Sequence, residues 1–289
     1  MSITSIDKEY VAGTYGRFPV ELVSGKGSIL TAADGKEYID LGSGIGVTCF
    51  GFGDEVWTKA VTEQAMKLQH VSNLYYTEPC AKLAQLLCEK TGMKKVFFSN
   101  SGAEANECAI KVARKYSAMK KGADCYTILT LQNSFHGRTI TTLAATGQDV
   151  FHQFFFPFTE GFRYADANNM DTVMAAAGDD VCAIMMELIQ GEGGVNALDK
   201  DFVNEAFRLA EENNLLIVAD EVQTGNGRTG ALYGYMKYGI TPDIVSTAKG
   251  IGGGLPIGIA MLGEKVENIL GAGMHGSTFG GNPVCAAGA

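Results

Sequence analysis

Short apolar runs rich in β-branched residues alternate along this chain with longer segments of helical periodicity. Strands that alternate with helices favour βαβ units, and therefore an α/β fold with a mostly parallel central sheet flanked by helices. Crevices at the carboxyl ends of such strands are where sheets of this kind bind ligands. The runs that predict strands are 95–98, 126–131, 181–186, 215–219, 244–247 and 257–262, and those that predict helices are 56–69, 80–91, 103–119 and 202–213.

The first part of the chain has a different character. Residues 28–31 and 37–41 predict two strands around an Asp-Gly turn. We therefore expect a small N-terminal segment over residues 1–45, an arm with a β-element, followed by one large domain over residues 46–289. Residues 282–289 resemble the first turn of a helix without its C-cap. We accordingly expect the chain to be a fragment.

Composition excludes several classes of protein. The net charge of −9 argues against nucleic acid or an anionic membrane as a partner. The N-terminus does not read as a signal peptide, and no apolar run reaches the roughly 20 residues of a membrane span. Seven scattered cysteines without a C-x-x-C pair indicate a reduced, cytoplasmic protein. No spacing of zinc ligands is present, so we expect no metal site.

Two polar residues follow neighbouring predicted strands at the expected ligand-binding edge. Asp220 closes the run 215–219, and Lys249 follows the run 244–247 and precedes a glycine cluster. An amine and a carboxylate placed there suit pyridoxal phosphate (PLP), because a lysine binds its aldehyde and an acid pairs with its ring nitrogen. A surface lysine in a flexible loop and an acidic helix cap are the simpler alternatives. The apolar strands and the glycines make these alternatives less favoured.

Other segments at strand ends fit the same interpretation. Gly102 and Ala103 begin the longest predicted helix, where free backbone N–H groups bind anions. Taken alone, this segment is explained somewhat better by an ordinary turn with a Ser cap. Phe135 is suited to stack on a flat cofactor, and Arg138 to bind a substrate carboxylate. A core phenylalanine and a solvated arginine are the alternatives, and we assign the intervening His136 a structural role.

Acidic and small residues complete the candidate set. Glu187 or Glu192 follows another strand and is suited to orient or gate the site, although acids at loop starts are often only solvated. Val222 is placed to pack on one ring face while Gln223 reaches the phenolic oxygen. The glycine-rich loop 275–282, with two hydroxyl side chains, is suited to close on a phosphate. Glycine clusters without the G-x-G-x-x-G spacing disfavour a nicotinamide-dependent enzyme.

Taken together, these segments resemble the class III (subgroup II) aminotransferases of PLP fold type I. They occur in family order and with family spacing from about Tyr15 to the last residue. The resemblance implies PLP as cofactor and a homodimer. It also implies that the family's C-terminal small domain, which carries a second substrate-binding arginine, is absent from this sequence.

The resemblance also implies a role for each candidate residue. Lys249 is the catalytic residue and binds the cofactor covalently. Arg138, Ser277 and Glu192 contact substrate, with Glu192 changing partners between the two half-reactions. The remaining residues bind PLP, and among them Thr278 reaches the phosphate of the neighbouring subunit: Gly102, Ala103, Phe135, Asp220, Glu221, Val222, Gln223 and Thr278.

The implied activity is transfer of the terminal amino group of N2-acetyl-L-ornithine to 2-oxoglutarate, as in arginine biosynthesis. Ornithine, succinylornithine and 4-aminobutyrate are alternative donors that need the same cofactor residues. Ile45 stands where the ornithine-specific branch tends to carry an aromatic residue, which disfavours ornithine itself. A PLP-binding fragment without turnover is the alternative from another functional class.

Overall fold

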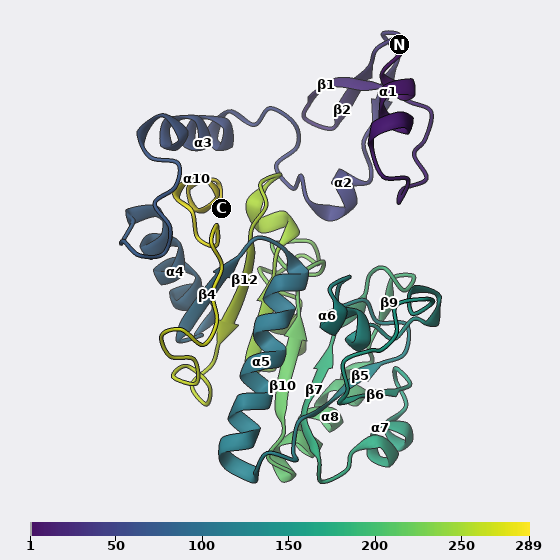
Figure 1. The fold of residues 1–289 in the computed structure, drawn as a ribbon, viewed down its shortest axis with the longest axis vertical. Helices are drawn as coiled ribbons and strands as arrows, with labels where there is room; N and C mark the ends of the chain where they lie inside the picture. The colour runs from purple at the N-terminus through teal and green to yellow at the C-terminus, as the bar shows by residue number, and fades with distance from the viewer. Residues whose placement is uncertain (1) are drawn as a thin grey trace.

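The computed structural model describes residues 2–289, and a seven-stranded sheet forms its centre (Figure 1). The strands are β4 (Lys95–Ser99), β5 (Thr127–Leu131), β6 (Phe162–Ala165), β7 (Val181–Met186), β10 (Leu216–Asp220), β11 (Ile244–Thr247) and β12 (Gly258–Leu262). Their order across the sheet is β4-β12-β11-β10-β7-β5-β6. Only β12 runs against its neighbours, so the predicted mostly parallel α/β sheet is confirmed.

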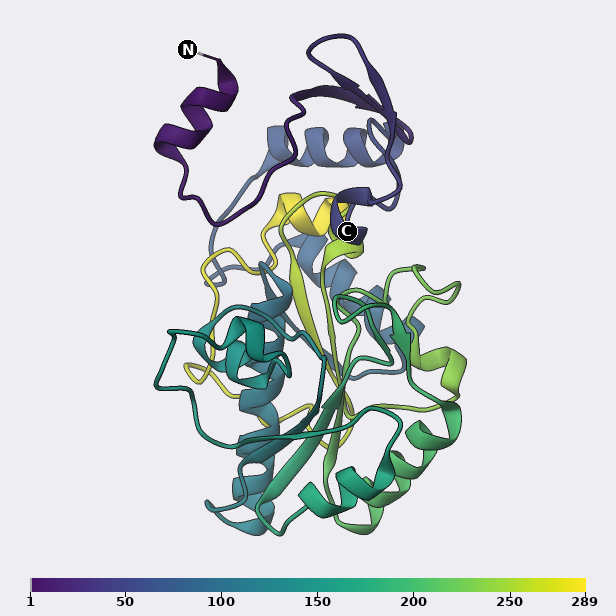
Figure 2. The same ribbon diagram turned by 90° about the vertical axis from the view of Figure 1, so that its right-hand side faces the viewer.

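Helices cover both faces of this sheet, as Figures 1 and 2 show from two sides. One face packs on α5 (Gly102–Lys121), and the opposite face packs on helices that include α8. Helix α8 spans Lys200–Glu212, and the remaining helices of the large sheet region are α3 (Glu55–Lys67), α4 (Glu78–Thr91), α6 (Ile140–Ala145), α7 (Met170–Ala176), α9 (Tyr235–Tyr238) and α10 (Pro283–Gly288). Two 3₁₀ turns cover Asp149–Phe151 and Lys249–Gly252.

The central strands are buried on both faces, which explains why they appear in the sequence as continuous apolar runs. Every residue of β5, β7, β10, β11 and β12 is buried. Side chains from alternate positions enter two separate apolar clusters, one on each face of the sheet. This two-sided burial is the usual condition of parallel strands, and it fixes the sheet as the rigid frame of the site.

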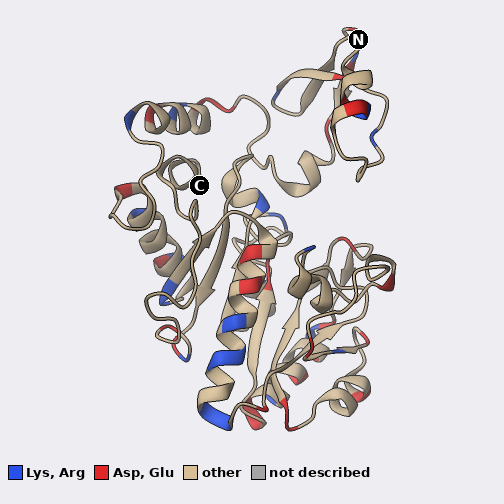
Figure 3. Ribbon diagram, in the orientation of Figure 1, with Lys and Arg blue, Asp and Glu red and all other residues tan. Residues whose placement is uncertain are grey.

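The sequence of α5 fits its length and direction. The Ser101 hydroxyl oxygen accepts the backbone N–H of Glu104 at 3.2 Å, and a Glu104 carboxylate oxygen accepts the backbone N–H of Asn100 at 2.8 Å. These bonds cap the helix start. Acidic residues lie near the beginning of α5 and basic residues toward its end (Figure 3), which complements the helix dipole.

The N-terminal residues form a separate small sheet. Strands β1 (Leu22–Lys26), β2 (Ile29–Ala32) and β3 (Glu37–Ile39) are antiparallel in the order β1-β2-β3. The predicted pair around the Asp-Gly turn is β2 and β3, and β1 adds a strand that the pattern did not indicate. Helix α1 (Ile3–Tyr10) has no buried residue, and the short α2 (Ser43–Gly46) leads toward the large domain.

The last residues form α10, which packs against α3 and α4. The Asn282 side chain caps this helix by accepting the backbone N–H of Cys285 at 2.9 Å. A two-stranded hairpin, β8 (Ile189–Gln190) with β9 (Asn196–Ala197), lies beyond the end of β7. Within residues 2–289, no helix has both the length and the apolar character needed to cross a membrane.

Candidate active site

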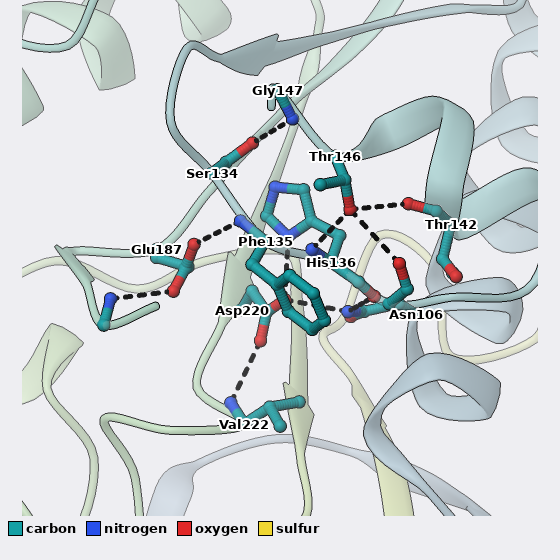
Figure 4. A network of polar contacts seen from close by, with 12 residues as sticks. Asn106, Ser134, Phe135, His136, Thr142, Thr146, Gly147, Glu187, Asp220 and Val222 are labelled. Carbon is teal, nitrogen blue, oxygen red and sulfur yellow. Dashed lines mark hydrogen bonds and ion pairs between the residues drawn. The ribbon is translucent and has the colours of Figure 1, made fainter. Parts of the chain in front are cut away.

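Asp220 ends β10 and lies at the centre of a buried polar network (Figure 4). Its Oδ2 is 2.8 Å from Nδ1 of His136 and accepts the side-chain amide of Asn106, also at 2.8 Å. Its Oδ1 accepts the backbone N–H of Val222 at 3.0 Å. A buried carboxylate needs such partners. The network therefore fixes the orientation of Asp220 at the carboxyl edge of the sheet.

Lys249 lies just beyond the end of β11, the parallel neighbour of β10. Its backbone adopts a φ of 49°, a left-handed conformation that is uncommon for a residue with a side chain. Burial lowers the pKa of the Lys249 amine, and the negative charges of Asp220, Glu187 and Glu192 oppose that shift. A lowered pKa enlarges the neutral, nucleophilic fraction of the amine.

A cavity of about 470 Å³ brings most of the predicted site residues together. Strand ends and the start of α5 supply its walls, so residues far apart in the sequence face one space. The candidate residues that line it are Gly102, Ala103, Phe135, Arg138, Glu187, Glu192, Asp220, Val222, Gln223 and Lys249.

The start of α5 provides anion donors on one wall of this cavity. Within the described part of the chain, the backbone N–H groups of Gly102 and Ala103 donate to no protein acceptor. Glycine at 102 allows close packing, because a Cβ there would lie 2.6 Å from Cγ1 of Val222. The cavity thus combines free N–H groups that can bind a phosphate, a carboxylate that can pair with a ring nitrogen, and a buried amine. These residues fit PLP.

An aromatic and a cation lie on the loop that follows β5 and packs beside the start of α5. The Phe135 ring lines the cavity and meets Phe151 edge-on, with 5.8 Å between ring centroids. The guanidinium carbon of Arg138 lies 3.8 Å from the centroid of the Phe151 ring. Arg138 makes no ion pair within residues 2–289 and is exposed. Its charge is therefore available to an anionic substrate.

Three predicted residues do not line this cavity. The Glu221 carboxylate faces away from it and accepts the backbone N–H groups of Gly234 and Tyr235, at 2.8 and 2.7 Å. The Ser277 hydroxyl accepts the side-chain amide of Asn100, a lining residue, at 3.1 Å, so Ser277 lies just behind the wall. Thr278 is exposed, which is compatible with a role at a neighbouring subunit.

Sequence reasoning missed the support around Asp220. Asn106 was not singled out, although it stands one turn into α5 on the face toward the sheet, where a buried amide implies a partner. His136 was expected to be structural, and its contact with Asp220 indicates that its role is to orient that carboxylate. Among residues 2–289, no group of three His, Cys, Asp or Glu side chains is placed to hold a metal ion. The seven cysteines are free thiols.

Comparison with known proteins agrees with this geometry. The family model described as Aminotransferase class-III matches residues 10–289. An acetylornithine aminotransferase of Haemophilus ducreyi is 52% identical over 99% of this chain and 73% of the relative. A succinylornithine transaminase of Citrobacter koseri is 43% identical over 96% of this chain and 69% of its own length. The crystal structure of an ornithine aminotransferase from Toxoplasma gondii superposes with a TM-score of 0.95 at 32% identity, covering 99% of this chain and 68% of that one.

The fold and the cavity define a PLP-type aminotransferase domain, and the chain belongs to the class-III aminotransferase family. The family resemblance inferred from the sequence motifs is therefore confirmed, and so is the assignment of the chain as an aminotransferase.

Proposed function

We propose that this chain binds PLP and transfers the terminal amino group of N2-acetyl-L-ornithine to 2-oxoglutarate. The products are N-acetylglutamate 5-semialdehyde and glutamate, a step of arginine biosynthesis in the cytoplasm. The observation that carries the proposal is the placement of Asp220 and Lys249 at the ends of adjacent parallel strands, facing one cavity. The 52% identity to an acetylornithine aminotransferase supports the choice of substrate.

Bound PLP would supply an electron sink that acidifies the carbon bearing the substrate amino group. In the proposed reaction, Nζ of Lys249 accepts that proton and returns it to a different carbon. Asp220, held by His136 and Asn106, would pair with the ring nitrogen. Phe135 and Val222 line the same cavity and would enclose the ring between them, and Gln223 would bind its oxygen.

Arg138 and Glu192 control the substrate side of the proposed site. Arg138 is exposed at the cavity, and its guanidinium is suited to bind the carboxylate of either substrate. A Glu192 carboxylate oxygen accepts the side-chain amide of Gln148 at 2.5 Å. Gln148 would thus be one of the partners between which Glu192 changes in the two half-reactions. Ser277 lies behind the wall that would face the substrate. We also propose a homodimer in which Thr278 reaches the cofactor phosphate of the neighbouring subunit.

The test is the visible absorption of purified protein mixed with PLP. We expect a band of covalently bound cofactor that bleaches with N2-acetyl-L-ornithine and returns with 2-oxoglutarate. Lys249→Ala serves as the control and should remove the band without unfolding the protein. A band whose absorbance changes with neither substrate would mean that the chain is a PLP-binding fragment without turnover. The absence of any band would overturn the cofactor assignment.

Substrate choice needs a second measurement, because succinylornithine, ornithine and 4-aminobutyrate would use the same cofactor residues. The similarity to a succinylornithine transaminase makes that substrate the main competitor. We expect the highest kcat/KM with N2-acetyl-L-ornithine among the four donors. A higher value with any other donor would reassign the substrate while leaving the transaminase proposal in place.

A further inference from the structure

Glu187 is a buried acid that none of the steps above uses. It follows the last residue of β7 and is 5% exposed. Its two carboxylate oxygens have different partners (Figure 4): Oε1 accepts the backbone N–H of Phe135 at 2.8 Å, and Oε2 accepts the backbone N–H of Gly191 at 3.1 Å. One side chain thus bridges two loops that come from different parts of the sequence.

Each bridged loop carries a residue of the proposed site. Phe135 is itself the aromatic that lines the cavity, and Gly191 precedes Glu192. Gly191 is closely packed, because a Cβ at this position would collide with the side-chain amide of Gln223. The bond from Gly191 to Glu187 therefore sets the position of a loop that meets the cavity through both Glu192 and Gln223.

The place of this carboxylate is electrostatically unfavourable. Burial and the nearby charge of Asp220 raise the pKa of Glu187 to about 7, while His136 and the two N–H donors act in the opposite direction. Two acids in one cavity wall repel each other. The carboxylate of Glu187 accepts two backbone N–H groups, one on each oxygen. A neutral amide could not do the same, because it has only one acceptor oxygen.

We propose that Glu187 is a positioning residue, which holds the Phe135 loop and the Gly191–Glu192 loop at a fixed separation across the cavity. This inference rests on the proposed transamination for its consequence, but the bridge itself belongs to the protein without cofactor. Glu187 lines the cavity, but both of its carboxylate oxygens already accept backbone N–H groups, so in this proposal it acts through Phe135 and Glu192.

The test compares Glu187→Gln with the unchanged protein. In the variant, the amide NH₂ faces one of the two backbone N–H groups, so one bond is lost and one loop is released. Hydrogen exchange of the protein without PLP should accelerate about tenfold in the peptides covering Phe135 or Gly191. With PLP, we expect a higher dissociation constant for the cofactor and a higher KM for the amino donor, with a smaller change in kcat.

Asp243→Asn provides the matched control. Asp243 also accepts a backbone N–H, that of Ile217 at 2.9 Å. It precedes β11, however, and so lies at the amino-terminal end of the strand, away from the carboxyl ends that form the cavity. It should change thermal stability without changing cofactor affinity or KM. If Glu187→Gln behaves like this control, with exchange near Phe135 and Gly191 unaltered, the positioning role is wrong.

The outcomes separate this inference from the proposed function. If the unchanged protein binds PLP but does not turn over, faster exchange and weaker PLP binding in Glu187→Gln still support the bridge. If the unchanged protein does not bind PLP, the proposed function fails, and exchange alone decides whether Glu187 joins the two loops.

Discussion

Gly102 shows how one missing side chain shapes the candidate site. A Cβ at this position would lie 2.6 and 2.9 Å from the two γ-carbons of Val222. Gly102→Ala must therefore push Val222 toward the space proposed for the cofactor ring, or displace the start of α5. We expect PLP affinity to fall about tenfold or more, since overpacking typically costs about 1–3 kcal/mol. Equilibrium titration with PLP measures this loss.

A matched variant isolates the cause of that loss. Gly13→Ala adds the same methyl group where no heavy atom lies within 4 Å of the new Cβ. It should leave PLP affinity unchanged. Equal affinities for Gly102→Ala and the unchanged protein would show that the close approach to Val222 does not shape the cofactor site.

The lowered pKa of the Lys249 amine leads to a prediction for the protein without cofactor. Burial is the largest cause of the shift, so the neutral amine is more abundant in the folded protein than in a solvated lysine. The rate of covalent PLP attachment should rise with pH and then reach a plateau. The midpoint of this rise should lie below 10.5, the ordinary pKa of a lysine amine. Stopped-flow absorbance at several pH values measures that midpoint.

Lys249→Arg is the control for this titration, because a guanidinium does not deprotonate in proteins. It should fold and form no covalent band at any pH. A midpoint at or above 10.5 in the unchanged protein would mean that the amine is solvated and that its burial has no chemical effect.

At the scale of helices and strands, two N-caps allow stability and function to be separated. Ser101 caps α5 by accepting the backbone N–H of Glu104, and Asp54 caps α3 by accepting that of Trp57 at 2.8 Å. Replacing either with Ala should lower the free energy of unfolding by about 1 kcal/mol. Only Ser101 lines the cavity beside the proposed phosphate donors.

We therefore expect Ser101→Ala to weaken PLP binding and Asp54→Ala to leave it unchanged, at similar losses of stability. Denaturant unfolding and PLP titration provide the two measurements. Parallel changes in both variants would indicate that cofactor affinity follows global stability, and would remove the special role of the α5 start.

The strands and helices that the sequence predicted are those with a strong local signal. Strand β7 is a fully apolar run, and α8 buries Phe202, Val203, Ala206 and Ala210 at helical spacing. Strand β6 was missed because it lies at the sheet edge, where only one of its residues is buried. Helix α1 was missed although Ile3, Ile6 and Tyr10 recur at helical spacing, because it is only eight residues long and all three side chains stay exposed, so no packing partner selects it.

The site was predictable to the extent that its residues follow strand ends. Asp220 and Lys249 could be paired from the sequence because both close apolar runs of a parallel sheet. The bonds from Asn106 to Asp220 and from Phe135 to Glu187 could not, since they join positions 114 and 52 residues apart whose mutual orientation depends on packing.

At the scale of the whole molecule, one exposed apolar surface lies beside Thr278. The Asn73 amide donates to the backbone oxygens of Ser277 and Gly280, both at 3.0 Å, and this joins two loops. Side by side they present the residues that we call the loop patch: Leu74, Tyr75, Tyr76 and Phe279, all largely exposed. Contiguous exposed apolar residues of this kind mark interaction surfaces, and Thr278 lies within one of the two loops.

We therefore predict that the protein is a dimer through the loop patch, and that the double variant Tyr76→Glu with Phe279→Glu is monomeric. Burying two added carboxylates in an apolar contact is unfavourable without partners. Sedimentation velocity measures the assembly state. Met174→Glu, which places the same charge on an exposed apolar residue of α7, should leave the dimer intact.

Cofactor binding then tests whether the dimer completes the site. If Thr278 reaches the phosphate held by the neighbouring subunit, the monomeric double variant loses PLP affinity, and Thr278→Ala loses affinity while remaining a dimer. The second variant is the decisive one, because it removes a hydroxyl and leaves the loop patch untouched. A dimer in which Thr278→Ala binds PLP like the unchanged protein would confine the cofactor site to residues of a single chain, with assembly serving only to cover the patch.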